Sequence, residues 1–140
     1  MRCQLQLQDG FLKAGNRQQI KFALMWANHD WSNHWPGTSA GETAPMSRQR
    51  HSEEDMLKAI DHCIEHYFRQ PNYWRIDGAL VFGIYSIGSV LRDMSPDRWR
   101  ASLARMRERV AKAGLGELHL QASSVTSAEV AKLKELGYIA

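Results

Sequence analysis

The chain has 140 residues, the length of one ordinary domain, and its 44% hydrophobic content can fill a core, so composition excludes a disordered chain. No apolar stretch has the length of a membrane span, and the first residues lack a signal-peptide core, which together predict a cytoplasmic protein without a membrane span. The net charge of +3 comes from Lys and Arg scattered among acidic residues, and the lack of a concentrated basic stripe argues against a nucleic-acid partner.

Three apolar runs predict β-strands, over residues 20–26, 79–85 and 117–121. The first two runs are continuously apolar rather than alternating, as expected for strands that are buried on both faces. An Asp77-Gly78 pair, typical of a tight turn, precedes the second strand. Residues 27–51 are polar and contain Pro and Gly, so we expect a long loop after the first strand.

Three amphipathic segments predict helices, over residues 52–69, 96–113 and 127–136. Capping signals stand at the three helix starts: Ser52 with Asp55, Ser95 with Pro96, and Thr126 with Glu129. Residues 138–140 read as the start of a further strand.

The alternation of strand and helix predicts an α/β fold with parallel strands and right-handed crossovers. Two architectures fit this order: an open α/β sheet, and part of a (β/α)8 barrel, which as a whole needs about 250 residues. Because the chain holds about three βα units and reaches the start of another strand, we expect a partial (β/α)8 TIM barrel, a piece of a larger one. Residues 1–140 then form a single partial-barrel domain, with residues 1–17 outside its core.

The candidate site follows from the fold, because ligands of parallel α/β sheets bind at the carboxyl ends of the strands. Polar and aromatic residues stand at all three ends: Trp26, Asn28, His29, Asp30 and Trp31 after the first strand, Tyr85 and Ser86 after the second, and Gln121 and Ser123 after the third. The first group suits a sugar, since Asn, His and Asp offer directional donors and acceptors to hydroxyls while Trp rings offer flat apolar faces to C–H groups. The alternative is a set of ordinary loop residues, with Trp26 filling the mouth of the barrel.

Residues 26–31 read Trp-Ala-Asn-His-Asp-Trp, and His-Trp-Pro-Gly follows at 34–37. This pattern resembles the signature of the glycoside hydrolase family 99-like domain, whose usual form is Trp-Ala-Asn-Glu-Asn-Trp followed by a Trp and a Gly. Residues 73–85, with a Tyr, an Asp-Gly turn, an apolar strand and a second Tyr, resemble a further stretch of that family. The similarity runs from about residue 18 to 92, and it departs from the family where His-Asp replaces Glu-Asn and where Ala79 replaces a Pro.

The resemblance implies a (β/α)8 barrel that acts on glycosidic bonds, as in bacterial polysaccharide and lipopolysaccharide biosynthesis proteins described as glycosyltransferases. It does not separate a hydrolase from a transferase. It also implies that the acidic pair of the true hydrolases lies beyond residue 140, so that this chain carries part of the sugar pocket.

Within that function, the catalytic candidates are Asp30, the only carboxylate of the cluster, and His29, which can orient it or act as a base. The substrate-binding candidates are the residues that stack on a ring or hold a hydroxyl: Trp26, Asn28, Trp31, Tyr85 and Gln121. Glycoside cleavage usually needs two carboxyl groups, which leaves Asp30 as a sugar-contacting or supporting residue. A purely structural role is the alternative, with Asp30 capping the loop and His29 hydrogen-bonded within it.

Two other patterns do not predict a metal site. His62, Glu65 and His66 match the inverted zinc-protease motif, but at ~100° per residue the two histidines lie opposite the apolar stripe and should face solvent. His29, His34 and His51 share a loop with Asp30 and could bind a metal together with it, but no ligand spacing supports this, so it is only the runner-up. We therefore expect no metal and no cofactor.

A non-catalytic chain is the alternative function: a truncated remnant, or a small α/β interaction module that forms homo-oligomers to cover its strand edges. In the first case the partner is a glycan, and in the second it is another copy of the chain.

Overall fold

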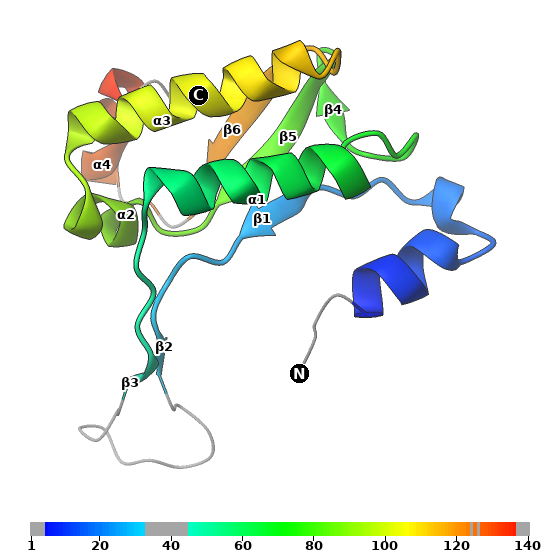
Figure 1. The fold of residues 1–140 in the computed structure, drawn as a ribbon, viewed down its shortest axis with the longest axis horizontal. Helices are drawn as coiled ribbons and strands as arrows, with labels where there is room; N and C mark the ends of the chain where they lie inside the picture. Colours follow the sequence, from blue (N-terminus) through cyan, green and yellow to red (C-terminus); the bar gives the residue numbers. More distant parts are fainter. Residues whose placement is uncertain (1–4, 33–44, 124, 126, 137–140) are drawn as a thin grey trace.

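The computed structural model describes residues 5–32, 45–123, 125 and 127–136, and it shows a parallel sheet with helices between its strands (Figure 1). The parallel strands are β1 (Leu24–Trp26), β5 (Ala79–Ile84) and β6 (Leu118–Ala122), in the order β1-β5-β6. The helices are α1 (Glu53–His66) between β1 and β5, α2 (Ile87–Asp93) and α3 (Pro96–Lys112) between β5 and β6, and α4 (Ser127–Glu135) after β6. The predicted α/β fold with three parallel strands is confirmed.

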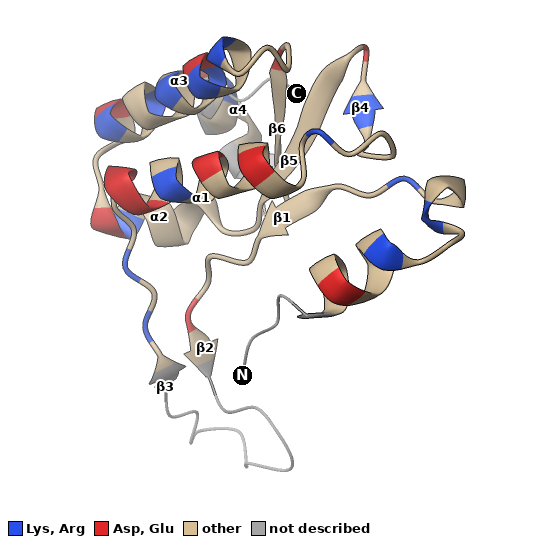
Figure 2. Cartoon of the chain, turned by 45° about the vertical axis from the view of Figure 1, so that its right-hand side comes forward, with Lys and Arg blue, Asp and Glu red and all other residues tan. Residues whose placement is uncertain are grey.

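Helices α1 and α3 lie side by side on one face of the sheet (Figure 1). The largest side chains that are fully buried in the core are Trp99, Phe68, Met56, Ile60 and Leu80. Arg105 pairs with Glu53 and Arg109 with Asp61 across the two helices, where Figure 2 shows acidic positions on α1 and basic positions on α3. Two of the scattered arginines therefore contribute to the packing of α1 against α3.

Helices α1 and α3 cover one face of the sheet. Neither of them covers the opposite face, called the uncovered face below, although Val81 is buried on that side too. Leu24, Phe82 and Leu120 are in register on the covered side, and Met25, Gly83 and Gln121 form the next row, on the opposite side. Met25 is 51% exposed although it lies in the middle of a strand. Glycine is required beside it, since a Cβ on Gly83 would lie 2.9 Å from the Met25 Cγ.

The predicted helix starts are confirmed where they can be seen. Ser52 caps α1 by accepting a hydrogen bond from the Asp55 N–H at 3.1 Å, and Ser95 caps α3 in the same way. Helix α1 ends at His66 rather than at residue 69, because the Tyr67 and Phe68 N–H groups both turn back to the Cys63 carbonyl. The predicted cap on Thr126 and the strand start at 138–140 lie outside the described residues.

Several short elements fall where the sequence predicts loop or longer strand. The first predicted strand, 20–26, is a regular strand only from Leu24. Residues 27–51 contain an antiparallel pair, β2 (Trp31–Ser32) and β3 (Pro45–Ser47), so the prediction of an unbroken loop is wrong there. Strand β4 (Arg75–Ile76) pairs antiparallel with the start of β5 through the predicted Asp77-Gly78 turn, whose φ angles are +48° and +83°. Strands of two or three residues are too short for a hydrophobic period to reveal them.

Helix α2 is also absent from the sequence prediction. Ser86 caps it by accepting a hydrogen bond from the Ser89 N–H, and its buried residues are Ile87 and Val90. Seven residues give only two helical turns, which is less than a periodic pattern needs to be convincing.

The residues before β1 form three short helical segments, Leu5–Gly10, Phe11–Lys13 and Arg17–Gln19. Leu7 and Leu12 pack against the core, and the buried Asn72 side chain donates hydrogen bonds to the carbonyls of Arg17 and Ile20. The described part of this segment is therefore tied to the sheet.

Candidate functional site

The carboxyl ends of the three parallel strands meet at one edge of the sheet. The Tyr85 N–H donates to the Trp26 carbonyl at 3.1 Å, and the Ser123 N–H donates to the Ile84 carbonyl at 3.2 Å. Parallel pairing thus continues one residue past each strand and brings together the segments in which the sequence places its candidate residues.

Asn28 is the buried anchor of this edge, with only 1% of its surface exposed. Its side-chain NH₂ donates to the Ser86 carbonyl at 2.7 Å, and its side-chain oxygen accepts from the Ser86 N–H at 2.8 Å. The amide acts as one more rung of the sheet ladder and fixes the chain after β1 to the start of α2.

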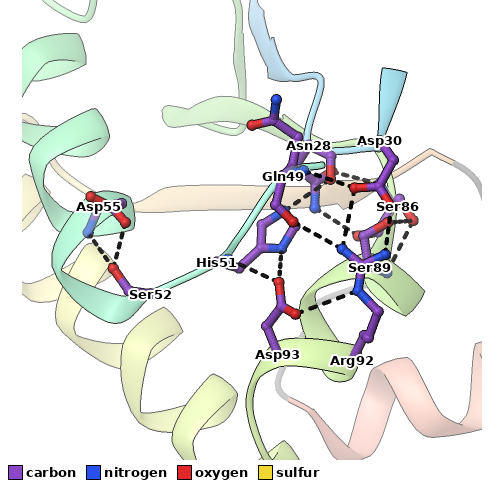
Figure 3. A network of polar contacts seen from close by, with 10 residues as sticks. All are labelled: Asn28, Asp30, Gln49, His51, Ser52, Asp55, Ser86, Ser89, Arg92 and Asp93. Atoms are coloured by element: carbon purple, nitrogen blue, oxygen red, sulfur yellow. Dashed lines mark hydrogen bonds and ion pairs between the residues drawn. The ribbon is translucent and has the colours of Figure 1, made fainter. Parts of the chain in front are cut away.

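His51 lies beneath this anchor, and its side chain is almost fully buried. Its Nδ1 lies 2.7 Å from Asp93 Oδ2 and its Nε2 lies 2.9 Å from the Asn28 carbonyl (Figure 3). Both ring nitrogens therefore face oxygen acceptors, and both hydrogen bonds are made when both nitrogens carry a proton. The hydrogen bond from His51 is the main reason that the pKa of Asp93 lies below its ordinary value.

Asp30 is held from two sides. Arg92 donates to both of its carboxylate oxygens, at 2.7 and 3.3 Å, and the Gln49 N–H donates to Oδ1 at 2.8 Å (Figure 3). The Arg92 hydrogen bond is the largest of the causes that lower the pKa of Asp30. An ionised carboxylate with its oxygens engaged suits an anchor better than a proton donor.

His29, Trp31 and Tyr85 form an aromatic group on the other side of the same segment. The His29 ring centroid lies 4.9 Å from that of Trp31 and 4.8 Å from that of Tyr85. Trp31 is 53% exposed and Tyr85 is 37% exposed, so the group is open to solvent. His29 is half-buried, and its Nδ1 is buried without a hydrogen-bond partner among the described residues.

The two remaining candidates lie apart from this group. The Trp26 ring packs edge-on against the His51 ring at 5.5 Å, which places it with the buried network. Gln121 is exposed on β6, in the row with Gly83 and Met25 on the uncovered face. The structure thus brings His29, Trp31 and Tyr85 together, and it places Asn28, Asp30 and Trp26 in or beside the polar network.

The histidine patterns of the sequence do not gather into a ligand set in the described part of the chain, where no group of three His, Cys, Asp or Glu side chains could hold a metal ion. His34 lies outside the described residues. His62 and His66 are half-buried rather than fully solvent-facing, because their rings pack on each other at 4.4 Å.

Sequence reasoning misses Arg92 and Asp93 and treats His51 only as one of several loop histidines. Arg92 meets Asp30 across 62 positions of sequence, and Asp93 meets His51 across 42, so no local spacing reveals either pair. One signal could have found them: ligands bind at the carboxyl ends of parallel strands, and Arg92 and Asp93 lie in the short segment that follows the carboxyl end of β5.

Comparison with known proteins places the chain in a family. Residues 7–139 match the model of the protein family described as glycosyltransferase WbsX. No curated protein and no solved structure gives a significant match to the chain. In the part that the structure describes, no helix is long and apolar enough to cross a membrane.

Proposed function

The chain belongs to the glycosyltransferase WbsX family, which has a carbohydrate-related role, and from that premise we propose that it binds a glycan at the carboxyl edge of its sheet. The observation that carries this proposal is the aromatic group of His29, Trp31 and Tyr85. It stands at the edge where ligands of parallel sheets bind.

The aromatic group has the chemistry that a sugar ring needs. Trp31 and Tyr85 each contact the His29 ring and stay exposed, so they offer apolar ring surface that a ligand can cover. A sugar presents C–H groups on the faces of its ring and hydroxyls around the edge, so it can stack on Trp31 while the Tyr85 hydroxyl and a His29 ring nitrogen meet its hydroxyls. His29 is therefore the proposed sugar-contacting residue, with Gln121 as a further contact on β6.

Asp30 has a different role in this proposal. Its carboxylate is bound by Arg92 and by the Gln49 N–H, so it positions the segment that carries His29 and Trp31. Asn28 and Trp26 support the same segment from below. The assignment of Asp30 to proton transfer stays a prediction, and the hydrogen bonds around it favour the positioning role.

We further propose that the sheet belongs to a (β/α)8 barrel in which a glycosidic bond is cleaved or transferred. The placement of α1 and α3 on one face supports this, because a barrel has its helices outside and its strand interiors facing each other. The row of Met25, Gly83 and Gln121 on the face opposite these helices would then face the barrel interior. Since glycosidic cleavage uses two carboxyl groups, the contribution proposed for the described residues is binding of the glycan.

A second candidate function rests on the same uncovered face. Met25 and Trp74 are 51% and 42% exposed, and a second copy of the chain could cover them in a homo-oligomeric interaction module. Sedimentation equilibrium separates the two functions. A stable dimer that Met25→Lys dissociates, together with no glycan binding, would favour the module.

The test of the glycan proposal is binding of the purified chain to an array of bacterial polysaccharide fragments, followed by titration calorimetry with the fragment bound best. Trp31→Ala and Tyr85→Ala should each weaken binding by about tenfold, the effect of losing a stacking ring. Ile20→Ala is the control, because Ile20 is also exposed but precedes the amino-terminal end of β1. Unchanged affinity in both aromatic variants would contradict the proposal.

A further inference from the structure

A polar hollow lies next to the aromatic group, on the other side of Asp30. It is lined by Asp30, Arg48, Gln49, Arg50, His51, Ser52, Arg92 and Asp93. Its volume of about 680 Å³ falls within the range of small-molecule sites. The hollow is polar where the aromatic group is apolar, so the two surfaces suit different parts of a ligand.

The backbone that forms one wall of the hollow is held at Gln49 and His51, on either side of Arg50. The Gln49 N–H donates to Asp30, the Gln49 carbonyl accepts from Arg92, and the His51 N–H donates to Asp93. Three main-chain hydrogen bonds within three residues fix this coil although it lies outside any helix or strand. The side chains of Arg48 and Arg50 therefore stand on a preorganised support.

The side chains of Arg48 and Arg50 line the hollow but take no part in this hydrogen-bond network. Both are exposed, and neither has an ion pair with another described residue. Figure 2 shows basic positions on the coil that leads from β3 to α1, the segment that contains both residues. Arg48 lies close enough to Asp30 to contribute to the lowering of its pKa. By contrast, Arg92, Arg105 and Arg109 all pair with carboxylates.

The hollow carries a net positive charge. Three arginines against two aspartates leave +1 on the lining residues, before any proton on His51 is counted. The two carboxylates are already bound, Asp30 by Arg92 and Asp93 by His51 and Arg92, so they offer an incoming anion little free negative charge. The acidic first turn of α1 is also engaged, since Glu53 pairs with Arg105 and Asp55 with Ser52.

We propose that this hollow binds an oxyanion carried by the glycan, a sugar carboxylate or a sugar phosphate, through the guanidinium groups of Arg48 and Arg50. Guanidinium groups match the planar geometry of both anions and form paired hydrogen bonds with them. The inference rests on the proposed glycan function and adds the substrate class, an acidic glycan. Since Asp30 lines the hollow and its two chain neighbours belong to the aromatic group, one glycan can reach both surfaces.

The experiment is titration calorimetry of the full chain with four probes: trigalacturonate, its fully methyl-esterified form, galactose 1-phosphate and inorganic phosphate. The variant is Arg48→Gln/Arg50→Gln, and the control is Lys21→Gln/Lys112→Gln, which removes the same two charges at residues that do not line the hollow. We expect the Arg variant to weaken binding of the acidic sugar by about tenfold or more, because charge-assisted hydrogen bonds are lost. The Arg variant should bind the ester as the wild type does, and the control variant should bind the acidic sugar as the wild type does.

The outcomes separate this inference from the function beneath it. If the Arg variant weakens binding of trigalacturonate more than binding of galactose 1-phosphate, the hollow is assigned to a carboxylate, and the reverse assigns it to a phosphate. Equal binding of trigalacturonate and its ester, unaffected by the Arg variant, overturns the anion site while glycan binding stands. Binding of inorganic phosphate as tight as that of either sugar overturns a site specific for glycans. Binding of none of these sugars, together with no binding on the array of bacterial polysaccharide fragments, overturns both proposals.

Discussion

The side chains on the two sides of the segment 28–31 differ in their hydrogen bonding and in their exposure to solvent. Asn28 and Asp30 turn toward α2, where the hydrogen bonds of Ser86, Arg92 and Gln49 occupy their polar atoms. His29 and Trp31 turn the other way, where Tyr85 joins them and solvent reaches the rings.

This difference indicates a division of labour between stability and binding. The polar side is largely satisfied internally, so its side chains have little left to offer a ligand and their main effect is to fix the backbone. The aromatic side leaves the Trp31 and Tyr85 rings exposed, so a ligand can still gain by contacting them. A preorganised site needs both parts: side chains that are free to contact a ligand, and hydrogen-bonded residues that hold their backbone in place.

Of the changes that test this division, Asn28→Ala should have the largest effect, and the effect should be on stability. The Ser86 N–H and carbonyl would lose their partners in a mostly buried place, which should lower the free energy of unfolding by about 2–3 kcal/mol. Urea unfolding followed by tryptophan fluorescence measures this loss. Gln18→Ala, at an exposed amide, serves as the control. A change below that of the control would remove Asn28 from the support.

A smaller effect, and one that depends on pH, is expected for Asp93→Asn. The pKa of Asp93 is lowered in the folded state from an ordinary 3.8, so its contribution to stability is present above that pH and is lost as pH falls through the lower folded value. The variant should be less stable than the wild type at pH 7, and the gap should narrow below about pH 4.

Urea midpoints measured from pH 7 to pH 3 test this dependence. Asp97→Asn is the control, because the Asp97 side chain is 89% exposed. A gap between the Asp93 variant and the wild type that stays constant over this pH range would contradict the assignment.

Asp30→Asn should be milder still, because the Asp30–Arg92 pair is partly exposed and solvent screens it. The positioning role predicts that Asp30→Asn and Arg92→Gln together destabilise the chain less than the sum of the two single variants. It also predicts that glycan affinity falls in both single variants alike. Strict additivity of the two changes, or loss of binding in the Asp30 variant alone, would instead support direct contact of Asp30 with the sugar.

The smallest effect on stability is expected for Trp31→Ala, since surface substitutions usually change the free energy of unfolding by about 0.5 kcal/mol or less. Its effect on glycan binding should be the largest of the four variants. Of the four variants, Asn28→Ala should therefore lower stability most, and Trp31→Ala should lower stability least but glycan affinity most. A Trp31 variant that unfolds as readily as the Asn28 variant would show that both sides of the segment support the fold.

Much of the fold could be predicted from the sequence because its signals are local. Ser52 and Ser95 mark helix starts through bonds to residues three positions ahead, and the run 79–85 is apolar enough to be a buried strand. The Asp77-Gly78 turn is predicted for the same reason, since it needs only the conformational freedom of its own residues. Strand β2, strand β3 and helix α2 could not be predicted, because they are too short for a period to appear.

The sequence by itself determined which residues stand at the ends of the parallel strands, because strand order and chain direction place those ends at one edge. Only the tertiary structure decided how they divide: Asn28 and Asp30 into the network, His29 and Trp31 into the open aromatic group. The physical reason is distance along the chain. Arg92 meets Asp30 from 62 positions away, and a partner that remote leaves no trace in the spacing of nearby residues.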